Sequence, residues 1–466
     1  MDSDTAIDTL SARYQDEVEK LRQYFAAGNT RPRQWRLAQL DALARLITDN
    51  ESAISEALAE DLDKPLQEVL MGETALILSE IRHARRHLRA WMRSRKVWTP
   101  AVGQPGSSWV QPEPLGVVLI IGAWNYPVQL LLAPLIPALA AGNCAVLKPS
   151  EVAAASSALM ARLVPEYLDS KAVTVVEGAV DETTALLRQR FDHIFYTGGA
   201  AVGRIVMKAA AEYLTPVTLE LGGKSPCVVD DGADLASAAR RIAWGKCLNA
   251  GQTCIAPDYV LVDKGRRDAL IAEIGRAIET MYGEQPLESP DFAAIINDRH
   301  YQRLKSYLDA GQVAIGGQSD DRRRRIAPTV LTDVDPNAEI MREEIFGPIL
   351  PVLDIDNLGQ AIDIIRQGEK PLAAYLFSGS RDNQRRFSDQ VSSGSLCIND
   401  VIMFMSVPDL PFGGVGQSGM GQYHGRAGFD RLSHLKSVMK RARWPEVNVR
   451  FAPYSQWKMR LLKWLA

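Results

Sequence analysis

The sequence predicts an α/β fold with more than one domain. The chain has 466 residues, a length that corresponds to roughly two to three domains of ordinary size. From Leu115 onward, short apolar segments alternate with segments whose apolar residues recur about every 3.6 positions. Short apolar strands separated by helices are typical of a parallel sheet covered on both faces. The hydrophobic content of 46% and charged content of 23% fit a soluble globular protein.

The expected elements follow one another in a simple order. Residues 8–95 predict helices with charged outer faces. Residues 107–116, "SSWVQPEPLG", predict an extended segment bounded by proline, which we assign as an edge strand. Strands and helices then alternate, and a second α/β region follows over residues 223–417. Residues 448–466 are a short, basic and aromatic tail.

The composition excludes several classes of protein. A net charge of −3 gives no electrostatic reason to expect a nucleic-acid partner. The five cysteines lack CxxC spacing and the six histidines are scattered, so we expect no disulfide framework, no metal site and a reducing compartment. The N-terminus lacks the apolar core of a secretory signal. Asn125 and several prolines interrupt the apolar stretch 115–147, which favours a buried strand and helix over a membrane span. These features predict a cytoplasmic protein.

Several motifs place ligand-binding residue types where expected strands end. Parallel sheets bind ligands beyond the carboxyl ends of their strands. "YTGGAAVG" places Gly198 and Gly203 where a strand turns into a helix, which suits either a pyrophosphate near backbone N–H groups or an ordinary tight turn. "KPSE" ends another strand with Lys148 and Glu151, which can hydrogen-bond ribose hydroxyls. Together these residues favour a dinucleotide site.

Other motifs supply candidates for chemistry. "EEIFGP" (343–348) places an acidic residue and an aromatic in a Gly-Pro turn, suited to a second ribose and a flat nicotinamide, and "WNYP" ends a strand with the amide of Asn125. "LELGGKSP" closes an apolar strand with Glu220, which is either a general base with a raised pKa or half of a structural ion pair. "NAGQTCIAPDY" contains Cys254, which is either a nucleophile or a small buried hydrophobe.

In this order, the motifs resemble those of the aldehyde dehydrogenase superfamily over nearly the whole chain. "PFGGVGQSGMGQYHG" (411–425) and "CINDVIM" (397–403) resemble its class 3, or fatty-aldehyde, branch. The resemblance implies a Rossmann-type cofactor domain, an α/β catalytic domain and a small bridging sheet that serves oligomerisation, with a homodimer as the expected assembly. The implied ranges are residues 1–106 and 115–222 for the dinucleotide-binding domain, 223–417 for the catalytic domain, 107–114 and 431–447 for the bridging segments, and 448–466 for the tail.

The resemblance also implies a role for each candidate residue. Cys254 matches the catalytic nucleophile, Glu220 the general base and Asn125 the donor to the oxyanion. We expect NAD as cofactor, because Glu151 would repel a 2′-phosphate, although class 3 relatives with the same carboxylate often accept NADP. The implied cofactor contacts are Lys148 and Glu151 to the adenosine ribose, Gly198 and Gly203 at the pyrophosphate, and Glu344 and Phe346 at the nicotinamide ribose and ring.

The expected reaction is the NAD(P)-dependent oxidation of an aldehyde to a carboxylic acid. Cys254 forms a thiohemiacetal and then a thioester, which water activated by Glu220 hydrolyses. The alternatives are a coenzyme A-acylating relative and a non-enzymatic structural protein with the same fold. A cysteine hydrolase is disfavoured because no histidine partner is evident in the local motifs. The remaining cysteines are expected to pack in the core: Cys144, Cys227, Cys247 and Cys397.

The expected substrate is a lipophilic aldehyde: medium- or long-chain aliphatic, aromatic or apocarotenoid. This expectation depends on the class 3 resemblance and on four apolar candidates for the substrate path, Tyr126, Leu130, Ile255 and Phe404. Phe404 stands where fatty-aldehyde relatives commonly carry histidine.

The tail "WKMRLLKWLA" has the composition of an interfacial helix. Trp457, Leu461, Trp464 and Leu465 fall along one helical stripe, and Lys458 would have to snorkel. A tail docked on its own domain or on a partner is the favoured interpretation. Weak peripheral association with a membrane is the alternative.

Overall fold

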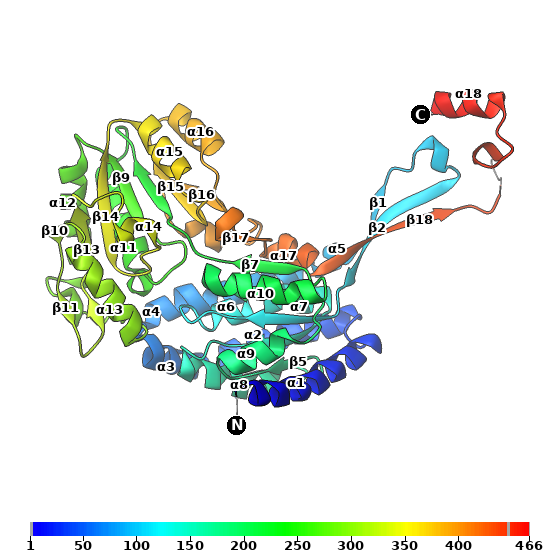
Figure 1. Ribbon diagram of the computed structural model, residues 1–466, viewed down its shortest axis with the longest axis horizontal. Helices are drawn as coiled ribbons and strands as arrows, with labels where there is room; N and C mark the ends of the chain where they lie inside the picture. The colour runs from blue at the N-terminus through cyan, green and yellow to red at the C-terminus, as the bar shows by residue number, and fades with distance from the viewer. Residues whose placement is uncertain (1–2, 445–447, 466) are drawn as a thin grey trace.

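The computed structural model describes residues 3–444 and 448–465. It contains a six-stranded sheet, a seven-stranded sheet and a three-stranded sheet that extends from the body as an arm (Figure 1). The α/β class predicted from the alternating pattern is therefore confirmed.

The six-stranded sheet is parallel except at one edge. Every residue of its four inner strands is buried, as expected for a sheet covered on both faces. Its strands lie in the order β17 (Gly419–Met420), β7 (Val217–Glu220), β6 (His193–Thr197), β3 (Val117–Ile121), β4 (Cys144–Lys148) and β5 (Val173–Val175).

Two groups of helices cover this sheet. Helix α1 contacts β3 and β4 and packs on α9, which packs on α10, whereas α7 and α8 contact β4 and β5 and pack on α2. A π-helical turn, η1 (Leu70–Thr74), interrupts the outer helices between α4 and α5. The bounds are α1 (Ser3–Ala26), α2 (Arg33–Asp49), α3 (Glu51–Leu62), α4 (Leu66–Val69), α5 (Ala75–Trp91), α6 (Gln129–Leu132), α7 (Leu135–Ala141), α8 (Ala154–Tyr167), α9 (Val180–Leu187), α10 (Ala200–Glu212) and α17 (Gly425–Arg431).

The seven-stranded sheet forms a second lobe (left in Figure 1). It is parallel apart from the antiparallel edge strand β10. Its strands are, in order, β10 (Gln312–Ile315), β13 (Thr329–Thr332), β14 (Ile349–Ile355), β9 (Tyr259–Asp263), β8 (Pro226–Val229), β15 (Ala373–Phe377) and β16 (Ser395–Ile398). The lobe also contains α11 (Leu235–Cys247), α12 (Arg267–Tyr282), α13 (Asp298–Ser306), α14 (Glu339–Arg342), α15 (Leu358–Gln367), α16 (Arg381–Gln390) and the small pair β11 (Ser319–Asp320) and β12 (Arg325–Ile326).

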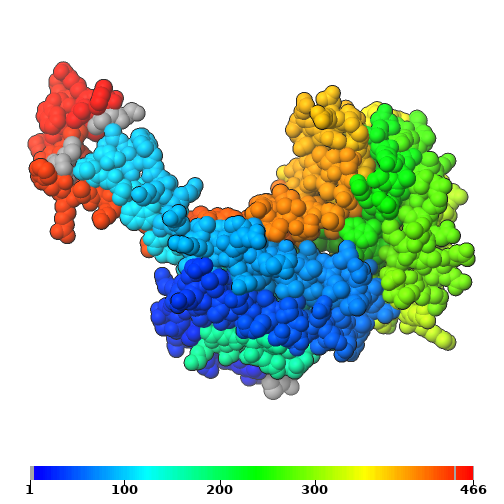
Figure 2. Space-filling view, turned by 180° about the vertical axis from the view of Figure 1, so that it is seen from behind, coloured from blue at the N-terminus to red at the C-terminus, as the bar shows by residue number. Residues whose placement is uncertain are grey.

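The arm consists of β1 (Arg95–Val97), β2 (Gly106–Pro114) and β18 (Ser433–Arg441), all antiparallel. The sequence predicted an edge strand over residues 107–116, but β2 is the middle strand of the three. β1 pairs with β2 only as far as Val110. The rest of β2, which contains Pro112 and Pro114, pairs with β18 on one side alone, so its prolines occupy an edge position even though β2 is the middle strand. Figure 2 shows a wide hollow between the arm and the second lobe.

The tail follows β18 to the tip of the arm, where α18 (Gln456–Leu465) contacts η2 (Ala101–Gly103) and η8 (Asn448–Arg450) (Figure 1). Lys458 does not snorkel outward. It is buried, and its Nζ donates to the carbonyl oxygens of Phe451 (2.8 Å) and Pro453 (2.9 Å). Trp457 and Trp464 remain exposed. Over residues 3–444 and 448–465, no helix combines the length and the apolar character needed to cross a bilayer.

Candidate active site

Four neighbouring strands of the six-stranded sheet present candidate residues at their carboxyl ends. β7 ends at Glu220, β4 ends at Lys148, β6 is followed by Gly198, and β3 leads into the turn that contains Asn125. The backbone N–H of Gly198 donates to the carbonyl oxygen of Glu220 at 3.0 Å, which joins two of these ends. The parallel topology thus gathers residues that lie up to 95 positions apart in the sequence.

The loop before Cys254 has an unusual backbone. Asn249, Ala250 and Gly251 have φ values of 54°, 50° and 74°, three successive residues in the left-handed region. Such conformations are costly for non-glycine residues and cluster at functional sites. The buried side chain of Gln252 holds the loop: its Nε2 donates to the carbonyl oxygens of Asn249 (3.0 Å) and Ala294 (2.9 Å). The thiol of Cys254 is therefore presented by a loop that is fixed from within.

Cys254 is half-buried and lines an apolar cavity. Burial raises the pKa of its thiol well above the usual range, and the nearby carboxylates of Glu344 and Glu220 raise it further. Hydrogen bonds from the backbone N–H groups of Cys254 and Ile255 act in the opposite direction. The same N–H groups are suited to stabilise negative charge beside the sulfur.

Glu220 is 3% exposed, and burial raises the pKa of its carboxyl well above the ordinary value. Neither of its carboxylate oxygens has a hydrogen-bond partner, and it forms no ion pair, among the residues that the structure describes. Of the two interpretations drawn from the sequence, a structural ion pair at Glu220 is therefore not supported. A buried carboxyl without a partner is expensive, and it is poised to exchange a proton with a water or ligand that reaches it.

Asn125 is buried and fixed from both ends. Its Nδ2 donates to the carbonyl oxygen of Gln252 at 3.0 Å, which links it to the Cys254 loop. The backbone carbonyl oxygen of Asn125 accepts hydrogen bonds from Lys64 Nζ (3.0 Å) and Asn249 Nδ2 (2.8 Å). The second N–H of the Asn125 amide is the one free to serve a ligand.

Lys64, which donates to the backbone of Asn125, belongs to a buried ion pair that the sequence did not predict. Lys64 Nζ lies 2.8 Å from Glu73 Oε1, with both side chains 0% exposed. Glu73 Oε2 also accepts the backbone N–H of Gln129 at 2.7 Å. Glu73 lies in the π-helical turn η1, and such turns are frequent at functional sites. The available signal was a glutamate within an apolar helical stretch.

A second missed carboxyl supports the loop directly. Glu68 Oε2 accepts the backbone N–H of Asn249 at 2.8 Å, at the start of the left-handed segment. Burial raises the pKa of Glu68 to about 7. The hydrogen bond crosses 181 sequence positions, so no local pattern could have predicted it.

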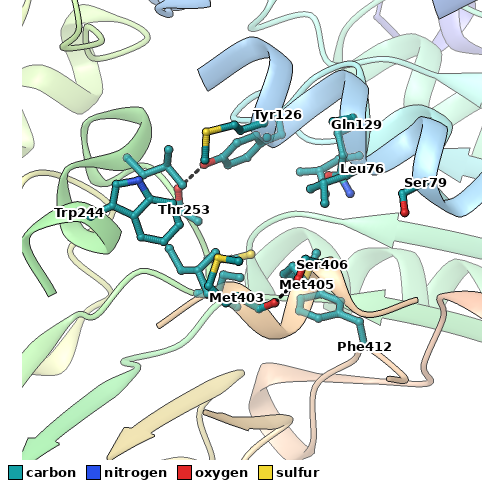
Figure 3. Close-up of a pocket in the computed structure, with 18 of the residues that line it drawn as sticks. Leu76, Ser79, Tyr126, Gln129, Trp244, Thr253, Met403, Met405, Ser406 and Phe412 are labelled. Atoms are coloured by element: carbon teal, nitrogen blue, oxygen red, sulfur yellow. Dashed lines mark hydrogen bonds between the residues drawn. The ribbon is translucent and has the colours of Figure 1, made fainter. Parts of the chain in front are cut away.

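An apolar cavity of about 360 Å³ adjoins Cys254 (Figure 3). Tyr126, Leu130 and Ile255, three of the predicted apolar candidates, line it. Tyr126 is fixed by a 2.8 Å hydrogen bond with Thr253. The further apolar lining is Met71, Leu76, Trp244, Leu248, Ile402, Met403, Met405, Phe412 and Tyr423. A cavity of this size and character suits an apolar small molecule.

Phe404, the fourth apolar candidate, is not among the residues that line this cavity. Its ring instead stacks between those of Tyr375 and Phe412, with centroids 6.5 and 6.3 Å away. Its neighbours Met403 and Met405 reach the cavity instead. The expectation was wrong for Phe404 because it lies in the short 3₁₀ turn Met403–Ser406, which directs adjacent side chains to different sides.

The residues expected to bind the cofactor's adenosine end form a separate group. Lys148 is 1% exposed, burial lowers its pKa, and its Nζ lies 3.5 Å from Glu151 Oε2. Glu151 is accessible, so the pair offers a donor and an acceptor suited to ribose hydroxyls. Gly198 has a φ of +155°, and a Cβ there would lie 2.3 Å from Tyr196 Oη.

Glycine is required at position 203 for a different physical reason than at position 198. A Cβ at Gly203 would lie 2.9 Å from Leu221 Cδ2, so this glycine allows α10 to pack closely beside the end of β7. The N-terminus of the 13-residue α10 directly follows the Gly198–Gly199 turn, and a Cβ at Gly199 would meet nothing within 4 Å. Open backbone at a helix N-terminus fits an anionic pyrophosphate.

Glu344 and Phe346 lie on the loop between α14 and β14. Glu344 accepts a hydrogen bond from the backbone of Gly223, and burial raises its pKa to about 8. Phe346, with a φ of 51°, meets Trp124 edge-on at 5.3 Å. The charge of Glu344 contributes to the raised pKa of the Cys254 thiol, so this loop lies within electrostatic range of the thiol.

No three His, Cys, Asp or Glu side chains are grouped to bind a metal ion in the described ranges. The other four cysteines are free, with Cys144, Cys227 and Cys247 buried and Cys397 half-buried.

The fold and the sequence place the chain among the aldehyde dehydrogenases. The sequence profile of the aldehyde dehydrogenase family matches residues 7–438. The chain therefore belongs to this family, and the resemblance noted in the motifs is confirmed.

Similar relatives include members of aldehyde dehydrogenase family 3. Rat aldehyde dehydrogenase family 3 member A2 is 49% identical over 445 residues, which cover 95% of this chain and 92% of the relative. The rat dimeric NADP-preferring aldehyde dehydrogenase is 49% identical over 424 residues, covering 91% and 94%. Among solved structures, the substrate-bound state of Staphylococcus aureus AldH matches with a TM-score of 0.94 and 42% identity, covering 97% and 98%.

Proposed function

We propose that the protein oxidises a lipophilic aldehyde to the carboxylic acid with NAD(P), using Cys254 as nucleophile, Glu220 as general base and Asn125 as oxyanion donor. The observation that carries these roles is that Cys254 faces an apolar cavity while the buried, unpartnered carboxyl of Glu220 lies near enough to raise the pKa of its thiol. The roles of Cys254 and Glu220 rest on that arrangement, and the role of Asn125 rests on its hydrogen bond to the loop that carries Cys254.

The chain's own residues divide the reaction into two stages. The Cys254 thiol loses its proton to solvent and its sulfur bonds to the aldehyde carbon, while the carbonyl π electrons move onto oxygen and form an oxyanion held by the Asn125 amide and the Cys254 backbone N–H. A bound nicotinamide dinucleotide would supply the acceptor for the hydride that leaves this carbon, and that loss leaves a thioester on Cys254. Glu220 then takes a proton from the water that cleaves the thioester, releasing the acid and the free thiol. The apolar walls keep other water away from the thioester.

Two substitutions and one control test these roles. Cys254→Ala is expected to abolish NAD(P)H formation, whereas Cys397→Ala, at the other half-buried cysteine, is expected to retain it. Glu220→Gln is expected to give a burst of NAD(P)H followed by slow turnover, because acylation is spared more than deacylation. Unchanged steady-state turnover in Glu220→Gln would remove Glu220 from the mechanism.

The substrate class follows from the cavity beside Cys254. Its lining is almost entirely apolar, so we infer a medium- or long-chain aliphatic, aromatic or apocarotenoid aldehyde. Values of kcat/KM are expected to rise from acetaldehyde toward the larger members of an aldehyde panel. A preference for the shortest members would contradict this inference.

For the cofactor, we infer that NAD is preferred and NADP is accepted. Lys148, Glu151, Gly198 and Gly203 are the residues that would hold its adenosine end, and Glu344 and Phe346 its nicotinamide end. The accessible carboxylate of Glu151 disfavours a 2′-phosphate by charge repulsion. The ratio of kcat/KM for the two cofactors measures this preference, and a strong bias toward NADP would refute it.

For the assembly, we infer a cytoplasmic homodimer in which the arm bridges the two copies. The cofactor domain would comprise residues 1–106 and 115–222, except that β1 belongs to the arm, and the catalytic domain residues 223–417. The arm projects from its own body and exposes Leu435 and Met439 (Figure 1). Light scattering that gives a monomer mass would contradict the dimer.

The exposed Trp457 and Trp464 support weak peripheral membrane association, which sedimentation with anionic vesicles tests.

A further inference from the structure

A small recess with several polar side chains in a partly apolar lining shares a wall with the apolar cavity. Its volume is about 10 Å³, which is the space that a single water-sized group occupies. Ser79, Gln129 and Met405 are among the residues that line both spaces. Glu80 and His424 line only the recess. Polar side chains thus gather at one border of a cavity that is otherwise apolar.

His424 is the central polar group of this recess. It is 5% exposed, and its Nε2 has no hydrogen-bond partner among the residues that the structure describes. Its ring stacks on Phe412, with centroids 5.6 Å apart, and meets Tyr423 edge-on at 4.4 Å, and Glu80 Oε1 lies 3.9 Å from His424 Nδ1. Glu80 is fixed in turn, because its Oε2 accepts the backbone N–H of Gly425 at 3.1 Å. A buried nitrogen held in place without a partner is costly unless a ligand satisfies it.

The electrostatics of the recess favour a neutral guest. Burial lowers the pKa of His424 to about 4, so the imidazole is uncharged at neutral pH. Burial raises the pKa of Glu80 to about 7, which leaves it able to donate or accept a hydrogen bond. The carboxyl of Glu80 would disfavour an anion, and a cation would lose its hydration on entering a largely apolar site. A hydroxyl can donate and accept at once, and its oxygen matches the available volume.

Two residues of the recess lie across the cavity from the residue that precedes Cys254. In Figure 3, Ser79 and Gln129 lie at the opposite end of the cavity from Thr253 and Trp244. Thr253 directly precedes Cys254. A substrate with its aldehyde carbon at Cys254 would therefore direct its distal end toward Ser79 and the recess.

We propose that the recess formed by Ser79, Glu80, Gln129 and His424 is a subsite for a hydroxyl group at the distal end of the aldehyde, so that hydroxyalkanals of matching length are preferred over plain alkanals. This inference rests on the proposed oxidation of lipophilic aldehydes. It adds that the apolar cavity selects its substrate by a polar group far from the carbonyl.

The test compares ω-hydroxyalkanals with n-alkanals of the same number of heavy atoms over a series of chain lengths. The ratio of the two kcat/KM values is expected to pass through a maximum at one length, about two- to tenfold above the lengths on either side, as one hydrogen bond provides. His424→Phe and Ser79→Ala are each expected to flatten this maximum. Leu130→Met, which alters the cavity wall alone, is expected to change both substrates in parallel and to keep the maximum.

The outcomes separate the subsite from the proposed function. A ratio without a maximum in the wild type overturns the subsite, and this measurement stands even if His424→Phe does not fold. A maximum that survives in both Ser79→Ala and a folded His424→Phe also overturns it. If no member of either series yields NAD(P)H, the proposed function itself fails. Oxidation of n-alkanals together with a flat ratio leaves that function intact and removes the subsite.

Discussion

The buried pair Lys64–Glu73 provides a sharp test of how the site is supported. Both side chains are 0% exposed and their charged atoms lie 2.8 Å apart, so solvent screens neither charge. Glu73→Ala leaves the Lys64 ammonium without its counter-ion and the N–H of Gln129 without its acceptor. Removing one partner of a buried ion pair costs about 3–5 kcal/mol. We expect the free energy of unfolding to fall by about that amount.

The assay is urea unfolding followed by circular dichroism, with Glu60→Ala on the exposed face of α3 as the matched control. Replacing the pair by Lys64→Met and Glu73→Leu together is expected to recover most of the lost stability, because neither charge is then left unpaired. The double variant still removes the donor to the Asn125 carbonyl oxygen. Its kcat is therefore expected to fall, by up to about 100-fold if Asn125 moves by about 1 Å.

Two results would refute this reasoning. One is a Glu73→Ala variant within about 1 kcal/mol of the wild type, a small change for a buried pair. The other is a double variant that is both stable and fully active, which would show that the pair does not position Asn125.

Two further predictions concern the Cys254 loop. Because burial and Glu344 raise the pKa of the Cys254 thiol, its alkylation by iodoacetamide, followed by peptide mass spectrometry, should keep accelerating as the pH rises above 9. Glu344→Gln should shift that profile to lower pH, and an unshifted profile would exclude Glu344 as a cause. Gly251→Ala should abolish activity, because the new Cβ would lie 2.2 Å from a backbone carbonyl oxygen at a φ of +74°. Gly283→Ala has a similar φ of +76° but open space, so it should cost only about 1–2 kcal/mol of stability; equal effects of the two substitutions would contradict the argument.

The sequence by itself determined the alternation of strands and helices and the ends of the strands that carry the site. Apolar runs such as residues 117–121 and 144–148 are buried on both faces, so their composition alone marks them as inner strands. A parallel sheet must present the residues after such strands at one edge, so the strand pattern alone was enough to make Lys148, Gly198 and Glu220 candidates.

The tertiary structure alone decided which groups support and surround Cys254. The contact of Glu68 with Asn249 and that of Lys64 with Asn125 each join segments far apart in the chain. The exclusion of Phe404 from the cavity depended on which way one short turn faces. Local periodicity reports which face of an element is buried, but not what it is buried against. Long-range packing supplies that information. It also leaves Glu220 without an ion-pair partner among the residues that the structure describes.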